Sequence, residues 1–164
     1  MSSSFSKWIA SWFLSKIETS EKFKILIRSI AEEYYVEKSL STYRVWGDNA
    51  RLTIGKNVHL NNAVINTVSG KVLVGDNAFL GHNVSLLTGT HDYMQLGLER
   101  QSSVPESGRD IVVGEGVWIA SNATIIGPCI IGENSVIGAN SVITGEVPPN
   151  SVYAGAPAKF IRKI

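Results

Sequence analysis

The sequence predicts an all-β main domain, built as a parallel β-helix with an extended loop, after a short helical segment. Three observations predict this fold class. All glycines and asparagines lie at or after Gly47, apolar residues before Gly47 recur every three or four positions, and aliphatic residues after it recur every six. We therefore assign residues 1–46 to an N-terminal helical segment and residues 47–164 to the main domain.

The composition argues against several classes of protein. Fifteen Lys and Arg residues nearly balance 14 Asp and Glu residues, which does not favour nucleic-acid binding. The single cysteine, Cys129, cannot form an internal disulfide, and no spacing of Cys and His resembles a structural zinc site. No apolar run approaches the roughly 18 residues of a membrane span, and the first residues lack the pattern of a secretory signal. We expect a cytoplasmic protein without a metal.

The N-terminal segment predicts two amphipathic helices, at residues 5–17 and 20–38. Their apolar faces are formed by Trp8, Trp12 and Phe13 in the first helix and by Phe23, Leu26, Ile27, Ile30 and Tyr34 in the second. These faces suit packing on the main domain or on a neighbouring subunit. They also suit peripheral contact with the cytoplasmic face of a membrane, because Trp and Phe beside Lys7 and Lys16 are typical of interfacial helices.

A six-residue period governs the main domain. Aliphatic residues recur at Val113, Ile119, Ile125, Ile131, Ile137 and Ile143, and upstream at Ile54, Leu60, Val74, Leu80 and Leu86. Smaller residues follow four positions after most of them, at Val58, Val64, Ala78, Val84, Val117, Ala123, Cys129, Ser135, Ser141 and Val147. Glycine and asparagine stand between these two positions. The period fits neither a helix face nor the hairpins of a sandwich, so each repeat is one short strand and one turn.

Three such sides close a coil of about 18 residues, and coils stacked about 4.8 Å apart pair as parallel strands. The aliphatic residues point into a narrow prism, where the second inward residue of each side has to be small. Glycine and asparagine supply the unusual dihedral angles at the corners. Residues 113–148 predict two coils and residues 54–88 about two more. Cys129 falls in an inward position, which favours a structural role over a nucleophilic one.

The six-residue repeat is interrupted at residues 88–110, where aliphatic residues no longer recur at the inward positions. We expect these residues to form a loop outside the coil, and long loops in compact domains are usually functional. His91 lies near its start, whereas His59 and His82 are assigned to corners of the coils.

Five motifs stand in the main domain: TGTHD at 88–92, GVWIASNA at 116–123, IGANSVIT at 137–144, VPPN at 147–150 and AGAPAK at 154–159. They resemble the motifs of the hexapeptide-repeat acyltransferases, in the sugar O-acetyltransferase branch that includes maltose and galactoside acetyltransferases. The resemblance covers about residues 50–164 and implies a left-handed parallel β-helix, a homotrimer with the site between subunits, and acetyl-CoA as the acyl donor.

The resemblance assigns the catalytic roles. His91 is the general base, and an ordinary histidine pKa of about 6.5 suits that role near neutral pH. The backbone N–H of Ser121 stabilises the oxyanion. Asn61 lies near the acetyl group and the acceptor, although an asparagine at a coil corner is an equally good explanation.

Other matched positions are assigned to the donor and the acceptor. The residues assigned to acetyl-CoA are Trp118, Ala120, Ser121, Ala139, Thr144, Lys159 and Arg162. Ser121 and Ala139 are one coil apart and form a vertical row for the pantetheine arm. Trp118 equally suits subunit packing, and Lys159 and Arg162 equally suit a solvated tail. Asp92 and Arg100 are candidates for the acceptor, with surface charge as the alternative for Arg100.

Two departures limit the match: Gly145 stands where the relatives usually have a lysine, and the N-terminal helices do not match the acceptor-binding module of the maltose and galactoside enzymes. The preferred function is an acetyl-CoA-dependent O-acetyltransferase acting on a sugar in bacterial surface-polysaccharide biosynthesis (capsule, O-antigen or exopolysaccharide).

The closest alternative is an N-acetyltransferase of an amino sugar or nucleotide sugar. A carbonic-anhydrase-like zinc solenoid using His59, His82 and His91, and a scaffold without catalysis, are the others. The spacing of the three histidines does not resemble the zinc ligands of that branch.

Overall fold

The computed structural model describes residues 2–164, except for the side chains of residues 2–7, 17–19 and 40. The side chain of Lys7, which the sequence places beside the aromatic residues, therefore lies outside the described part. The chain divides into two compact units, Met1–Ser39 and Leu40–Ile164.

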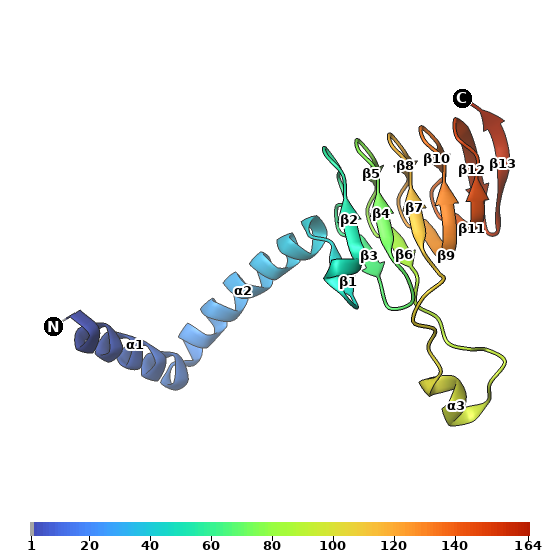
Figure 1. Ribbon diagram of the computed structural model, residues 1–164. Coiled ribbons are helices and arrows are strands. Elements are labelled where there is room, and N and C mark those ends of the chain that lie inside the picture. The colour runs from blue at the N-terminus through green and yellow to red at the C-terminus, as the bar shows by residue number, and fades with distance from the viewer. Residues whose placement is uncertain (1) are drawn as a thin grey trace. The chain divides into compact units, whose positions relative to one another are not determined.

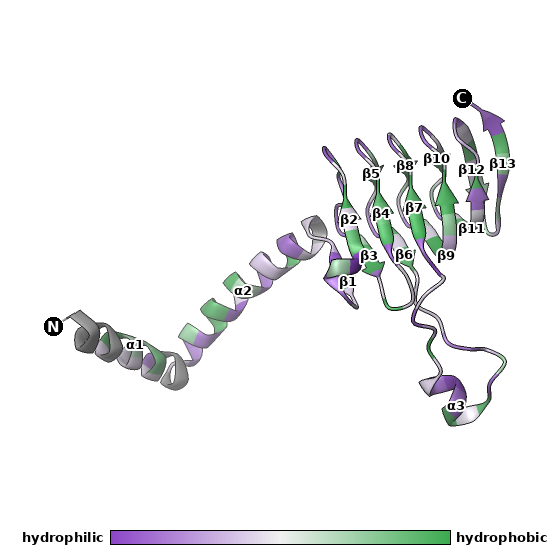
Figure 2. Cartoon of the chain, viewed as in Figure 1, coloured by the Kyte–Doolittle hydropathy of each residue, from purple (hydrophilic) through white to green (hydrophobic). Residues whose placement is uncertain are grey.

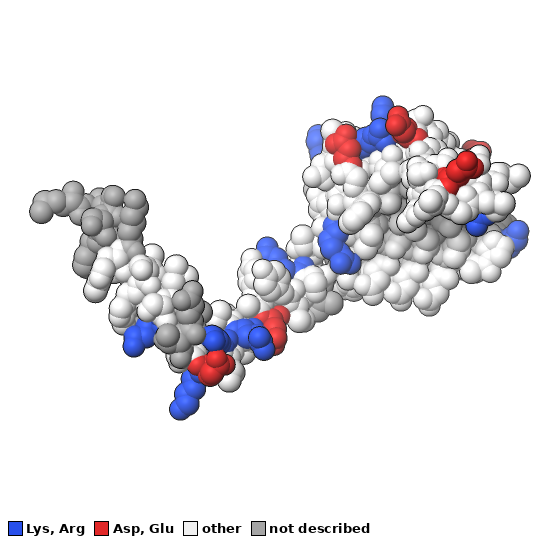
Figure 3. Space-filling view, turned by 90° about the horizontal axis from the view of Figure 1, so that it is seen from below, with Lys and Arg blue, Asp and Glu red and all other residues white. Residues whose placement is uncertain are grey.

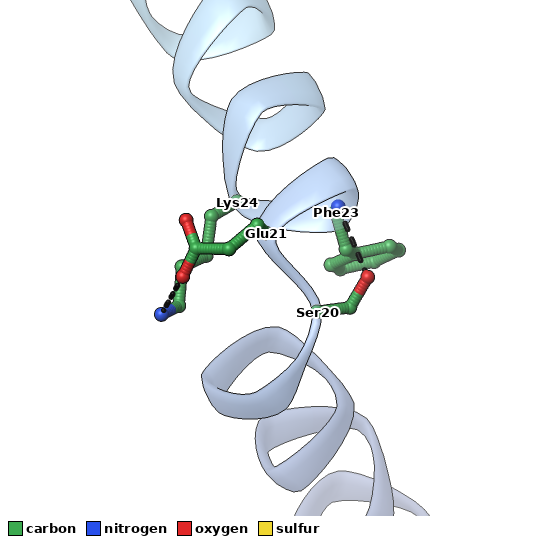
Figure 4. Close-up of polar contacts among 4 residues, drawn as sticks. All are labelled: Ser20, Glu21, Phe23 and Lys24. Atoms are coloured by element: carbon green, nitrogen blue, oxygen red, sulfur yellow. Dashed lines mark hydrogen bonds and ion pairs between the residues drawn. The ribbon is translucent and has the colours of Figure 1, made fainter.

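The first unit consists of two helices, α1 (Ser2–Thr19) and α2 (Glu21–Ser41), which confirms the two predicted helices and extends both (Figure 1). Ser20 separates them. Its Oγ accepts a hydrogen bond from Phe23 N at 3.3 Å, as an N-cap does, and Lys24 Nζ pairs with Glu21 Oε1 at 2.7 Å in the first turn of α2 (Figure 4).

The apolar side chains of these helices are largely exposed. Trp8, Trp12 and Phe13 have exposed fractions of 63%, 50% and 48%, and Ile30 and Tyr34 of 55% and 56%. The Phe13 ring meets the Phe23 ring edge to face at a centroid distance of 5.5 Å. Within the described part of the chain, no helix combines the length and the hydropathy needed to cross a bilayer.

The second unit is a parallel β-helix, which confirms the predicted fold class (Figure 1). Its strands are β1 (Arg44–Trp46), β2 (Leu52–Ile54), β3 (Val64–Asn66), β4 (Val72–Val74), β5 (Phe79–Leu80), β6 (Ser85–Leu87), β7 (Ile111–Val113), β8 (Trp118–Ile119), β9 (Thr124–Ile131), β10 (Val136–Ile137), β11 (Val142–Val147), β12 (Ser151–Gly155) and β13 (Ala158–Lys163). A 3₁₀ helix, η1 (Asn49–Arg51), precedes β2, and α3 (Gly97–Ser102) lies in the long loop.

The strands stack in three walls. One wall follows β2, β4, β7 and the end of β9, the second follows β5, β8, β10 and β12, and the third follows β1, β3, β6 and the start of β9. Ile119 pairs with Ile137, as the predicted 18-residue coil requires. β1 pairs with β3, so the stack begins before Gly47; the domain boundary at Gly47 stays a prediction. At the other end β13 folds back antiparallel on β12.

The core is the inside of the prism. Every predicted inward aliphatic residue except Ile54 is buried, and so are most predicted small residues. Ile54 has an exposed fraction of 37%, because β2 is the last strand of its wall. In Figure 2 the stacked strands are largely hydrophobic, as this interior requires.

The prediction that Val64 occupies an inward position is wrong. Ala63 and Ile65 are the fully buried residues of that side, and Val64 is only half-buried. The turn at Asn61 and Asn62 is one residue shorter than the others, so the inward positions shift by one. Ala63 N donates to Leu60 O at 3.1 Å and closes this turn.

The corners depend on asparagine. The non-glycine residues with positive φ are all asparagines, with φ between 46° and 61°: Asn57, Asn61, Asn77, Asn83, Asn122, Asn134, Asn140 and Asn150. Gly116, with φ of 64°, takes the same place in another turn. The left-handed conformation costs most residues about 1–2 kcal/mol, and asparagine tolerates it because its short amide bonds locally.

Asn134 offers a test of this corner rule, since its side chain is exposed. We expect Asn134→Ala to lower the free energy of unfolding by about 1–2 kcal/mol, because alanine resists the left-handed conformation. Asn134→Gly should restore most of the loss. Urea unfolding at one protein concentration measures both. An alanine variant as stable as wild type contradicts the rule.

Candidate active site

The predicted loop at residues 88–110 is confirmed. β6 ends at Leu87, β7 begins at Ile111, and the segment between them, with α3, extends away from the stacked strands (Figure 1). The coil therefore opens at the edge between the wall of β6 and the wall of β7.

His91 lies in a cavity of about 330 Å³ formed by the loop itself. Its lining comprises Thr90, His91, Asp92, Tyr93, Ser103, Val104, Pro105 and Arg109. Asp92 N donates to Ser103 O at 2.9 Å and ties the two sides of the loop together. His91 is exposed, and no residue of the described chain hydrogen-bonds to its ring. The ring is therefore open to contact with a bound molecule.

The side chains of Asp92 and Arg100 both form hydrogen bonds to other residues of the loop. The Asp92 carboxylate accepts from Met94 N at 3.0 Å and from Gln95 Nε2 at 3.3 Å. Arg100 Nε donates to Gln95 O at 2.7 Å. These bonds shape the turn after His91, and binding of the acceptor by Asp92 and Arg100 stays a prediction.

Ser121 and Ala139 lie in turns at one edge of the prism, between β8 and β9 and between β10 and β11. Asn140 N donates to Ser121 O at 3.1 Å, so the two turns stack as predicted. Ser121 Oγ accepts from His82 N at 3.2 Å in the turn of the preceding coil. Within the described residues, Ser121 N–H has no acceptor and can serve a ligand.

Asn61 lies on this same edge. Its φ of 46° makes it a corner residue, and its Nδ2 donates to Leu80 O of the next coil at 2.6 Å. The corner explanation is therefore present in the structure, and a catalytic role for Asn61 stays a prediction.

The remaining residues assigned to the donor lie at the surface. Trp118 has an exposed fraction of 44% and stacks on Phe79 at a centroid distance of 5.8 Å. Ala120 is half-buried, and Thr144 lies next to a register shift in β11. Lys159 and Arg162 are exposed on β13, opposite Ala154 and Val152 of β12. Their binding of acetyl-CoA stays a prediction.

One chain does not bring His91 and the Ser121 row into one cavity. The cavity of His91 is lined by loop residues alone. The loop leaves the edge between β6 and β7, whereas Ser121 lies at the edge between β8 and β9. A prism with three walls keeps these two edges apart. The sequence did not predict that Ser103, Val104 and Pro105 line the cavity, because the loop has no repeating pattern that places its residues.

The other reactive groups give no second site. Cys129 is buried, and its burial raises the thiol pKa to about 12. His82 lies in a corner turn, but His59 does not, since it forms a bridge with Phe79 on a wall. Among the residues that the structure describes, no three His, Cys, Asp or Glu side chains are grouped to hold a metal ion.

Comparisons with known proteins show the class of this parallel β-helix with its histidine loop, which is that of the acyltransferases. The family described as "Bacterial transferase hexapeptide (six repeats)" matches residues 110–145. Galactoside O-acetyltransferase of Escherichia coli K12 is 33% identical over 151 residues, which cover 92% of this chain and 71% of that protein.

Two solved structures are also similar. A galactoside acetyltransferase in complex with coenzyme A matches with a TM-score of 0.67 and 32% identity, over 76% of this chain and 62% of that one. A hexapeptide-repeat acetyltransferase of Vibrio cholerae, complexed with acetyl-CoA, matches with a TM-score of 0.63 and 25% identity, over 90% and 81%.

The chain belongs to the hexapeptide-repeat acyltransferase family, as its motifs predicted. Its class of enzyme, an acyltransferase, is confirmed with it. The predicted donor, acetyl-CoA, is confirmed at the level of the family by the two ligand complexes.

The state of Cys129 gives a prediction. With a thiol pKa of about 12 and 2% of the residue exposed, it should not react with a thiol reagent at pH 8 in the folded protein and should react fully in urea. Colorimetric thiol titration measures this. Rapid labelling of folded protein with loss of activity would show that Cys129 is an accessible nucleophile.

Proposed function

We propose that this protein transfers an acetyl group from acetyl-CoA to a hydroxyl of a sugar, in the cytoplasmic assembly of a bacterial surface polysaccharide. The observation that carries the proposal is His91, whose ring has no hydrogen-bond partner in the described chain and lines a cavity in the loop that interrupts the β-helix. The relatedness to galactoside O-acetyltransferase supports a sugar hydroxyl as the acceptor.

The proposed chemistry needs one base and one oxyanion donor. The His91 ring takes the proton of the acceptor hydroxyl, and the oxygen attacks the thioester carbonyl of acetyl-CoA. The free N–H of Ser121 stabilises the negative oxygen of the tetrahedral intermediate. The intermediate then collapses, the C–S bond breaks, and the thiolate of CoA receives the proton from His91.

The edge with Ser121 and Ala139 suits a long, thin donor. Ala139 is exposed with a small side chain, and the stacked turns offer N–H groups in a row. Trp118 flanks this edge, and Lys159 and Arg162 supply positive charge for phosphates. The resemblance is the basis for assigning the pantetheine arm to this row.

We propose a homotrimer, and the separation of the two edges in one chain supports a site shared between copies. If each site takes His91 from one chain and the Ser121 row from the next, three copies around one axis close a ring with three identical sites. The family resemblance implies the same arrangement.

We expect His91→Ala to lower turnover about 100- to 10,000-fold, which is the range typical for loss of a general base. Binding of acetyl-CoA and assembly should be unchanged. Radiolabelled acetyl transfer to sugars, nucleotide sugars, amino sugars and lipid-linked oligosaccharides measures turnover. A variant with more than about a tenth of wild-type turnover contradicts the role.

Mixing two inactive chains provides the control for the shared site. His91→Ala keeps the donor row, and Ala139→Trp keeps the base but blocks the row. Random trimers of equal amounts of both should regain about a quarter of wild-type activity, because one site in three is intact in each mixed trimer. A site within one chain would regain none.

The helical unit supports peripheral membrane contact as the second part of the proposal. Trp8, Trp12 and Phe13 are exposed, and Lys16 Nζ lies 5.9 Å from the centre of the Trp12 ring. Residues 1–28 contain five Lys or Arg residues and two Glu residues. Figure 3 shows basic side chains near the junction of α1 and α2, and Figure 2 shows apolar residues along α2. Apolar rings beside lysines suit an anionic lipid surface.

We expect the protein to bind phosphatidylglycerol vesicles more strongly than phosphatidylcholine vesicles, and deletion of residues 1–17 to abolish this binding. Lys16→Glu should weaken it by more than about fivefold, since each basic residue contributes about 1 kcal/mol and the glutamate is repelled. Vesicle sedimentation measures it, with Lys71→Glu in the second unit as the control. Unchanged binding after the deletion would leave the helices as packing surfaces.

A further inference from the structure

The long loop is fastened at its base to residues 66–69 of the preceding coil. Thr88 is fully buried, and its Oγ1 donates to Asn66 O at 2.8 Å and accepts from Ser69 N at 3.2 Å. The Asn66 side chain continues the contact, because its Oδ1 accepts from Val68 N and Gly89 N, each at 3.0 Å. The loop therefore leaves the coil from a fixed point three residues before His91.

Two arginines extend this fastening to the returning half of the loop. Arg109 Nε donates to Thr88 O at 2.8 Å, so the guanidinium joins the last part of the loop to its first residue. Arg51 lies far away in sequence, just before β2. Its Nη1 donates to Glu106 O at 3.0 Å, and also to Val68 O at 2.8 Å and Thr67 O at 3.3 Å. One cationic group thus links the loop to residues 67 and 68.

The backbone of Arg109 is itself fixed. Its N–H donates to Ser69 O at 3.2 Å. A Cβ at Gly70 would lie 2.6 Å from the carbonyl carbon of Arg109, so the two segments are in direct backbone contact there. Neither arginine has an acidic partner in the described chain; both bond to carbonyl oxygens. Such charge-assisted bonds are stronger than neutral ones.

These contacts bear on the catalytic base. The ring of His91 has no partner among the described residues, so its position depends on the loop backbone. Among the described residues, the bond from Asp92 N to Ser103 O, at 2.9 Å, is the one that links the two halves of the loop next to His91. The other cross-links are those at the base, from Arg51 and Arg109.

We propose that Arg51 and Arg109 are positioning residues for His91: by binding the carbonyl oxygens of Glu106 and Thr88 they hold the loop so that the base meets the acceptor hydroxyl. This inference rests on the proposed function. Arg51 is the more informative of the two, because it does not line the cavity of His91, whereas Arg109 does.

The decisive experiment measures Arg51→Ala in two backgrounds. In an otherwise wild-type chain we expect kcat to fall about 10- to 100-fold, as a misplaced catalytic group does, with little change in KM for acetyl-CoA. In the His91→Ala background, Arg51→Ala should cause no further loss, because it acts through His91.

Lys71→Ala is the matched control. Lys71 is exposed beside the base of the loop, and its backbone N–H, rather than its side chain, bonds to Asp110. It should leave kcat unchanged. Arg109→Lys keeps the charge and loses Nε, and we expect it to behave as Arg109→Ala. Full activity in Arg109→Lys would mean that Arg109 acts by its charge on the acceptor and would overturn its positioning role.

Hydrogen exchange separates this proposal from the proposed function. Arg51→Ala should speed amide exchange across residues 90–106 and leave the strands unchanged, whether or not the protein acetylates sugars. Unchanged exchange in the loop overturns the inference, as does an equal loss of kcat in both backgrounds. Faster exchange in a protein without transferase activity would refute the proposed function and leave the fastening of the loop in place.

Discussion

The structure depends on residues that accept a left-handed backbone conformation in the short turns at two of the three edges of the prism. Asparagine fills this place in most of these turns and Gly116 in one. A turn of this kind directs the chain into the next wall over few residues, so each strand is short and each repeat takes six. Stacking then adds a second constraint: the amides of Asn62 and Asn83 bond at 2.7 Å, and Asn83 bonds to Asn122 at 3.3 Å, which joins corners of three successive coils. Such ladders align the turns that form the row with Ser121.

Because the prism is narrow, the candidate functional residues lie outside its interior. Two inward side chains per strand fill the interior, and even Cys129 is packed there with a thiol pKa too high for nucleophilic chemistry at neutral pH. Chemistry is left to the edges and to inserted loops. His91 and the Ser121 row occupy different edges, so the proposed enzyme needs a second copy of the chain to complete each site.

A loop that carries a catalytic base has to be rigid, whereas a long loop is flexible unless other segments hold it. Here the rigidity comes from the coil before the loop, through Asn66, Thr88 and the two arginines. The fold and the proposed mechanism meet at this point, because the coil supplies the carbonyl oxygens of residues 67 and 68 that Arg51 binds together with the loop carbonyl of Glu106. In the helical unit, by contrast, apolar side chains such as Trp8 and Ile30 are exposed.

The sequence by itself determined the walls, the corners and the interruption at residues 88–110. It could do so because size and backbone preference are local properties that recur at each sixth position, as Ile119 and Asn122 illustrate. It misplaced Val64 because a turn one residue shorter leaves the composition unchanged. Its placement of His59 at a corner was wrong because the residue between two inward positions, here Val58 and Leu60, lies on a wall. Only the tertiary structure decided which edge carries each candidate residue. The bonds of Arg51 to Glu106, across 55 positions, arise from folding and leave no periodic mark in the sequence.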